Sequence, residues 1–279
     1  MSWCINLRCF IVLFLIFTTG CKAQTTTELV SDSGKKIVSN SLTYDSTIKT
    51  IHILVALCDN KYQGIVPVPA KIGNGQDPAN NLYWGCAFGI KSFFKNSNDW
   101  KLLKTIAVDS VILERLTFKH KTSNTILIAD AYNGQFIKQC TVDFLNSSCG
   151  LKKDTLHINN MTVGINGNAK LIAYIGHDGL MDFQLKNTFV NTDNKLRDVM
   201  ILACYSKHFF SPLLQKAHVQ PLLWSTGLMS PEAYTIHAAL SAYLNKQPQE
   251  QMRSDVAKAY SNYQKCSYNA AYRLLTTGW

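Results

Sequence analysis

Two residue types that together perform nucleophilic chemistry stand at the ends of two apolar runs. The stretch KLIAYIGHDGLM, residues 170–181, contains an aliphatic and aromatic run that ends at His177, between two glycines. The stretch DVMILACYS, residues 198–206, ends its own run at Cys204. A thiol attacks as the thiolate, and a nearby imidazole can take its proton and later give it to a leaving amine. This pair predicts a cysteine nucleophile with a histidine base.

The elements that carry the pair are predicted to be neighbouring strands. Both runs are continuous rather than alternating, which is typical of strands buried on both faces of a parallel sheet. Consecutive strands often pair, and ligands gather at the carboxyl ends of parallel strands. His177 and Cys204 are therefore expected at one rim of the sheet. The turn GHDG beside the base also offers main-chain N–H groups for a developing oxyanion.

The rest of the pattern favours an α/β three-layer sandwich with a mainly parallel sheet. Further strands are expected at 51–58, 111–118, 125–132 and 221–227. Helices are expected at 80–96, at 134–146, from an N-cap at Ser230 with Pro231 in the first position, and within 248–275.

The two blocks resemble the catalytic blocks of the clan CD cysteine peptidases, which include caspases, metacaspases, legumain, clostripain and gingipains. LIAYIGHDGLMDF and VMILACYS are most similar to the legumain-type pattern, in which an aliphatic-His-Gly block precedes a strand ending in Glu-Ala-Cys. The resemblance implies a caspase-like fold and hydrolysis of peptide bonds in a peptide or protein substrate through a thioester. It makes His177 the general base and acid, Cys204 the nucleophile, and the amides near Asp178 and Gly179 the oxyanion donors.

The sequence departs from the family pattern in ways that keep two alternatives open. Asp178 stands where the family has glycine, Leu-Ala rather than Gln-Ala or Glu-Ala precedes Cys204, and the cysteine is only 27 positions after the histidine. One alternative is an inactive homologue, a non-catalytic binding or structural lipoprotein on the same fold. The other is an unrelated flavodoxin-like domain in which both residues only pack. His208, four residues after the cysteine, is a rival base.

Two further residues are candidates for binding substrate. Asp59 follows the first strand, where some enzymes of this clan read the side chain before the scissile bond, and an acid there would suit Arg or Lys. The competing interpretation is a carboxylate that caps the loop. Thr226 ends the stretch PLLWSTG, where the family's substrate-binding strand would end.

The first 50 residues are predicted to direct export and to attach the protein to a membrane. Residues 1–20 contain the apolar run CFIVLFLIF after Arg8, which has the length of a signal peptide and is too short to span a bilayer. TTGC, ending at Cys21, resembles the lipobox of bacterial lipoproteins, which implies a lipid on Cys21 and a place in the cell envelope, periplasmic or surface-exposed. An ordinary signal peptide is the alternative. Residues 21–50 are rich in Ser, Thr and Lys and predict a tether, with the α/β domain over 51–279.

The charge, the motifs and the cysteines of the sequence argue against several other classes of function. The net charge of +10 is carried by scattered lysines without a basic stripe, so we expect no nucleic-acid partner. There is no phosphate-binding glycine motif and no paired C-x-x-C, so no cofactor and no metal are expected. The six cysteines after Cys21 show no small disulfide framework, and most are expected to be buried apolar residues.

Overall fold

The computed structural model describes residues 43–279. The predicted signal segment, Cys21 and most of the predicted tether lie outside the described residues. The chain enters its first strand at Lys49, two residues before the predicted boundary of the domain. No helix in the described part of the chain combines the length and the apolar character that crossing a membrane requires.

The described chain is an α/β fold built on a mixed sheet of eight strands, in the order β10-β9-β8-β7-β1-β4-β3-β2. The five central strands, from β9 to β4, are parallel, and the strands at both edges are antiparallel. The sheet strands are β1 (Lys49–Ala56), β2 (Trp100–Ile106), β3 (Ile112–His120), β4 (Thr125–Tyr132), β7 (Leu171–Gly176), β8 (Arg197–Leu202), β9 (Val219–Ser225) and β10 (Leu275–Thr276). A separate ribbon pairs β5 (Lys153–Ile158) with β6 (Met161–Asn166).

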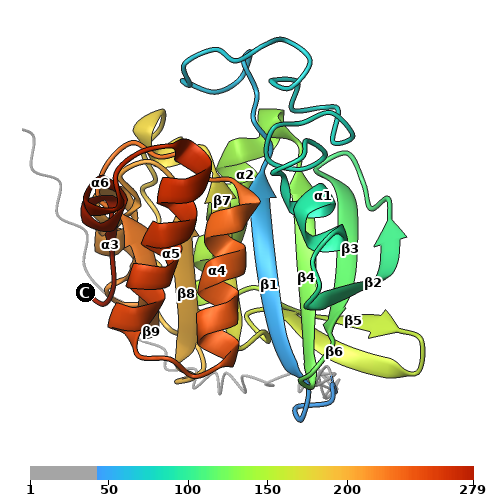
Figure 1. Ribbon diagram of the computed structural model, residues 1–279. Helices are drawn as coiled ribbons and strands as arrows, with labels where there is room; N and C mark the ends of the chain where they lie inside the picture. Colours follow the sequence, from blue (N-terminus) through green and yellow to red (C-terminus); the bar gives the residue numbers. More distant parts are fainter. Residues whose placement is uncertain (1–42) are drawn as a thin grey trace, which may run out of the picture. The chain divides into compact units, whose positions relative to one another are not determined.

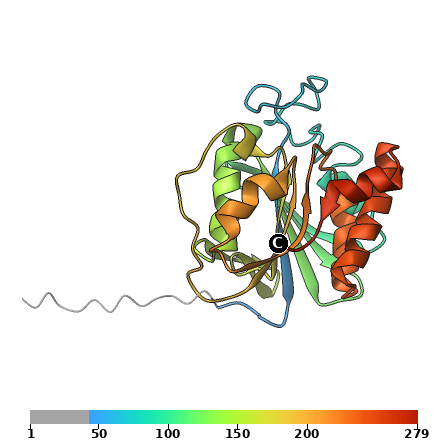
Figure 2. The same ribbon diagram turned by 90° about the vertical axis from the view of Figure 1, so that its left-hand side faces the viewer.

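Helices cover both faces of the sheet, as Figure 2 shows edge-on. One face packs against α1 (Ile90–Lys95), α4 (Ala233–Leu244), α5 (Gln249–Gln264) and α6 (Tyr268–Leu274). The other face packs against α2 (Ile137–Ser148) and α3 (Ser206–Leu214). Alternate residues of the buried strands supply the two cores, because side chains of a strand point to opposite faces in turn. The prediction of an α/β protein with a mainly parallel sheet is confirmed.

A buried polar cluster ties the central strands together. Asp130 on β4 accepts two hydrogen bonds from the Arg115 guanidinium on β3, at 2.6 and 2.7 Å. His52 on β1 lies 3.0 Å from the same carboxylate through Nε2, while its Nδ1 accepts the N–H of Asn166. Since Nδ1 is an acceptor, the neutral ring carries its proton on Nε2 and donates to Asp130. Neither His52 nor Asp130 is exposed by more than 1%, so the pair is structural.

Several predicted elements differ from the structure. Of the helix expected at 80–96, only Ile90–Lys95 is helical, because the chain folds back at Gly85, where a Cβ would lie 2.0 Å from the Ala79 carbonyl oxygen. The helix expected from Ser230 begins at Ala233, and Glu232 is its N-cap. The Ser230 N–H is held instead by the Tyr260 hydroxyl.

Candidate functional site

The carboxyl ends of the parallel strands carry the predicted pair (Figure 1, where β1 points upward to this rim). β7 and β8 are adjacent and parallel, and Ile175 is in register with Leu202. The pairing ends there, and His177 and Cys204 each follow two residues later in the sequence. Neighbouring strands are about 4.8 Å apart, so the two backbones leave the sheet side by side.

The imidazole of His177 is oriented by a carboxylate that follows it closely in sequence. Its Nε2 lies 2.8 Å from Asp182 Oδ2, at the end of a short 3-10 turn over Gly179–Met181. The same oxygen accepts the N–H of Gly64 at 3.0 Å, which links this turn to the loop after β1. With Nε2 donating to Asp182, Nδ1 is the nitrogen that remains free to act as a base. The His177 side chain is only 5% exposed.

Gly176 sets the direction in which the chain leaves β7. Its φ of +132° lies in a region that glycine adopts and other residues avoid. A Cβ there would lie 2.3 Å from the carbonyl oxygen of Ala56 on the neighbouring strand β1. Glycine is therefore required immediately before the histidine for this geometry.

We expect Gly176→Ala to lower the free energy of unfolding by about 1–3 kcal/mol, through overpacking and backbone strain. Gly227→Ala is the matched control, since a Cβ at Gly227 meets only the Leu274 side chain, at 3.2 Å, without a positive φ. Urea denaturation of both variants measures the difference. Equal stabilities would contradict the requirement for glycine at 176.

Cys204 follows β8 in a strand-turn-helix junction. Tyr205, the next residue, is left-handed with φ +49°, and α3 begins directly after it. The Cys204 Sγ lies 3.4 Å from both the carbonyl oxygen and the N–H of Met229. No hydrogen bond joins this sulfur to His177 within residues 43–279. Burial raises the pKa of the Cys204 thiol, the Met229 N–H opposes that rise, and the charge of Asp178 adds to it.

Asp178, the residue after the histidine, is fully buried. Its Oδ1 accepts the N–H of Leu180 at 2.9 Å, whereas its Oδ2 is buried without any partner among the described residues. Burial raises the pKa of this carboxyl to about 7, the Leu180 hydrogen bond opposes the rise, and the nearby charge of Asp182 adds to it. A carboxylate here also opposes ionisation of the Cys204 thiol.

The two predicted oxyanion donors lie in the turn that follows the histidine. Gly179 opens the 3-10 turn, and a Cβ there would lie 2.8 Å from the Phe183 ring. The neighbouring Tyr174 hydroxyl donates to the His177 carbonyl oxygen at 2.7 Å. Neither the Asp178 N–H nor the Gly179 N–H makes a hydrogen bond within the described chain.

Asp59 organises the loop after β1 and is only 1% exposed. Its Oδ1 accepts the N–H groups of Lys61 and Tyr62, and its Oδ2 accepts the side-chain amide of Gln76 at 2.6 Å. Gly75 also packs directly on this carboxylate, since a Cβ there would lie 2.4 Å from Oδ2. Asp59 has the contacts of a loop-capping residue, and its charge is turned away from solvent.

The two remaining candidates lie on the outside of the rim. Thr226 is exposed after β9, and its hydroxyl donates to the carbonyl oxygens of Arg273 and Leu274. His208 is exposed on α3, and its ring packs edge-on against Phe209. Neither side chain has a hydrogen bond to Cys204.

The sequence prediction missed Asp182 and Met229. Asp182 stands five residues after His177 in GHDGLMD, a spacing that brings a carboxylate back to the ring only when the intervening residues form a tight turn. An acidic residue shortly after a candidate base is the signal that could have identified it. Met229 contacts Cys204 through its main chain alone, so its residue type gave no signal.

Within residues 43–279, no group of three or more His, Cys, Asp or Glu side chains is arranged to hold a metal ion. A scan against protein-family models, a search of curated proteins and a search of solved structures each gave no significant match.

Proposed function

We propose that the chain is an exported, lipid-anchored cysteine endopeptidase with a caspase-like or legumain-like fold. The observation that carries the proposal is that His177 and Cys204 each stand two residues beyond Ile175 and Leu202, the last registered pair of the adjacent parallel strands β7 and β8. The central position of β1, with the histidine strand and the cysteine strand following in order on one side of it, supports the resemblance in fold. The attachment through Cys21 rests on the sequence pattern alone.

The proposed reaction uses the free nitrogen of the histidine. Nδ1 of His177 takes the proton of the Cys204 thiol, and the thiolate attacks the carbonyl carbon of a peptide bond. The C–N bond then breaks as the imidazolium gives its proton to the leaving amine, which leaves a thioester on Cys204. A water molecule, deprotonated by the same imidazole, hydrolyses the thioester and restores the thiol. Asp182 stabilises the imidazolium in both steps.

In this proposal, the contacts of the resting site keep the reactivity of Cys204 low until substrate binds. The Cys204 sulfur is hydrogen-bonded to the main chain of Met229. The His177 ring is buried, and its partner Asp182 accepts the N–H of Gly64. In this proposal, a movement of the loop after β1 or of the loop at Met229 brings Nδ1 to the thiol. A substrate strand that displaces these contacts would supply that movement, since catalytic hydrogen bonds often tighten only when substrate is bound.

The test is the alkylation rate of Cys204 by iodoacetamide at pH 7.5, followed residue by residue by mass spectrometry. We expect His177→Gln to slow the alkylation of Cys204 at least tenfold and to leave Cys266 unaffected. His208→Gln is the matched control and should leave the rate unchanged. Cleavage of a denatured protein substrate should disappear in Cys204→Ala.

Two results would overturn the proposal: no alkylation of Cys204 at neutral pH, or an equal rate in His177→Gln. Either would favour the non-catalytic binding or structural lipoprotein on the same fold. That alternative has its own support, because burial and the charge of Asp178 both raise the pKa of the thiol and no hydrogen bond joins sulfur to imidazole within the described residues. The labelling experiment separates the two functions directly.

A further inference from the structure

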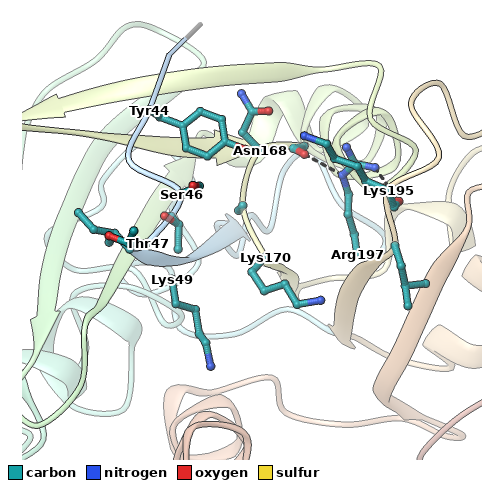
Figure 3. Close-up of a pocket in the computed structure, with 13 residues that line it drawn as sticks. Tyr44, Ser46, Thr47, Lys49, Asn168, Lys170, Lys195 and Arg197 are labelled. Atoms are coloured by element: carbon teal, nitrogen blue, oxygen red, sulfur yellow. Dashed lines mark hydrogen bonds between the residues drawn. The ribbon is translucent and has the colours of Figure 1, made fainter.

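The opposite rim of the sheet, at the amino ends of the parallel strands, holds a cavity of about 450 Å³. It is bounded by the segment that leads into β1, by the loop between β6 and β7, and by the start of β8. Its lining contains four cationic residues and no acidic residue: Lys49, Lys170, Lys195 and Arg197. Figure 3 shows Lys49 and Lys170 next to each other at the strand starts, with Tyr44 and Asn168 across the cavity.

Acidic side chains near the cavity neutralise only some of its four positive charges. Arg197 is tied to the protein, because its guanidinium donates to both carboxylate oxygens of Asp193 and to the carbonyl oxygens of Gly167 and Lys195. Lys170 lies 3.4 Å from Asp198, but its side chain is half exposed and Asp198 also accepts the Tyr243 hydroxyl.

The other two lysines keep their charges available to a ligand. The Lys49 ammonium lies 5.1 Å from the centre of the Tyr243 ring and makes no ion pair within residues 43–279. Lys195 is exposed and has no side-chain partner in the same range. The hydroxyl groups of Ser46 and Thr50, which also line the cavity, make no hydrogen bond to described residues. The cavity therefore presents ammonium groups and hydroxyl donors together.

We propose that this cavity, the lysine pocket of Lys49, Lys170 and Lys195, binds a phosphate-bearing ligand of the size of a phospholipid headgroup. Lysine ammonium groups bind phosphate as point charges, and several of them around one cavity suit the multiple oxygens of a phosphate better than a single carboxylate. The volume is within the range of small-molecule sites. Cys21, the predicted lipid attachment site, is 22 residues before Thr43, where the described chain begins. Headgroups of the membrane surface and free phosphate esters are thus two sources of the same chemistry.

The experiment compares two triple variants of the full chain, each also carrying Cys21→Ser so that no lipid is attached there. The pocket variant is Lys49→Gln, Lys170→Gln and Lys195→Gln. The control variant is Lys101→Gln, Lys104→Gln and Lys121→Gln, which removes the same charge from exposed positions outside the pocket. Glycerol 3-phosphate is titrated by calorimetry, and vesicles of phosphatidylcholine with and without phosphatidylglycerol are tested by cosedimentation. Thermal melting verifies that both variants fold.

We expect the pocket variant to bind at least tenfold more weakly than the parent, while the control variant keeps the parent's affinity. If the pocket variant loses binding only to the vesicles, the ligand is a membrane headgroup. If it loses binding to glycerol 3-phosphate, the ligand is a free phosphate ester. Equal weakening in the two triple variants would overturn the site in favour of general attraction to the net positive charge. Absence of binding by the parent in both arms would overturn it as well, including the case in which the chain's own N-terminal residues fill the pocket.

Discussion

An Asp130→Ala variant is expected to lose about 3–5 kcal/mol of the free energy of unfolding, because one partner of a buried ion pair is removed. Asp130 accepts two bonds from Arg115 and one from His52, and the substitution leaves those donors buried without an acceptor. Chemical denaturation at pH 7 measures the loss. Asp255→Ala is the control, since its pair with Lys258 on the surface of α5 is worth less than about 1 kcal/mol.

The Asp130 carboxylate should also make the free energy of unfolding depend on pH in the acid range. Burial by itself would raise the pKa of Asp130, but His52 and Arg115 outweigh it and hold the pKa at about 2. A depressed pKa means that the stabilisation is complete above the unfolded value near 4 and is lost as the pH falls through about 2. The parent should lose this increment on acidification and the variant should not. A loss below about 1 kcal/mol at pH 7 would show that the cluster is not a stabilising element.

Asp178→Asn is expected to raise the free energy of unfolding at neutral pH, whereas Asp130→Ala lowers it. Because the pKa is raised from 3.8 to about 7, the folded chain keeps a proton that the unfolded chain releases between these values. Stability therefore falls as the pH rises through that window and is lowest above pH 7. Asparagine keeps an acceptor for the Leu180 N–H and removes the charge. We expect a gain of up to about 4 kcal/mol at pH 8 that vanishes near pH 4, from 1.36 kcal/mol per pKa unit.

This substitution has a second readout at the cysteine. The charge of Asp178 raises the pKa of the Cys204 thiol, so its removal should move the midpoint of the alkylation rate against pH to lower pH. Unfolding curves at pH 5, 6, 7 and 8 measure the first effect, and alkylation rates between pH 7 and pH 11 measure the second. A stability difference that is constant from pH 5 to pH 8, with an unchanged alkylation midpoint, would contradict the assignment of Asp178 as the perturbing carboxyl.

The sheet was predictable where strands are aliphatic on both faces. The strand expected at 125–132 coincides with β4, and the runs before His177 and Cys204 are β7 and β8. The β5–β6 ribbon and the edge strand β2 were missed, because polar residues interrupt their apolar runs and the strands contribute a small separate core or an exposed edge. Continuity of apolar residues is a signal of central strands only.

The positions of the two predicted residues at strand ends could be predicted from the sequence, and their surroundings could not. Strand ends and chain order are enough to bring His177 and Cys204 to one rim. The unpartnered oxygen of Asp178 and the hold of Met229 on the sulfur depend on how distant loops pack, and no local pattern encodes that. Asp178 was recognised as the departure from the family pattern, but its burial came only from the structure.

All six cysteines in the described chain are free thiols, and this affects how the protein can be made and handled. No disulfide joins the described residues, so we expect the chain to reach its native state under reducing as well as oxidising conditions. Cys58, Cys140 and Cys149 are buried, whereas Cys86, Cys204 and Cys266 are partly open to reagents. In an oxidising compartment the candidate nucleophile therefore shares its exposure to oxidation with two other thiols, and purification without a reductant should progressively lower its reactive fraction.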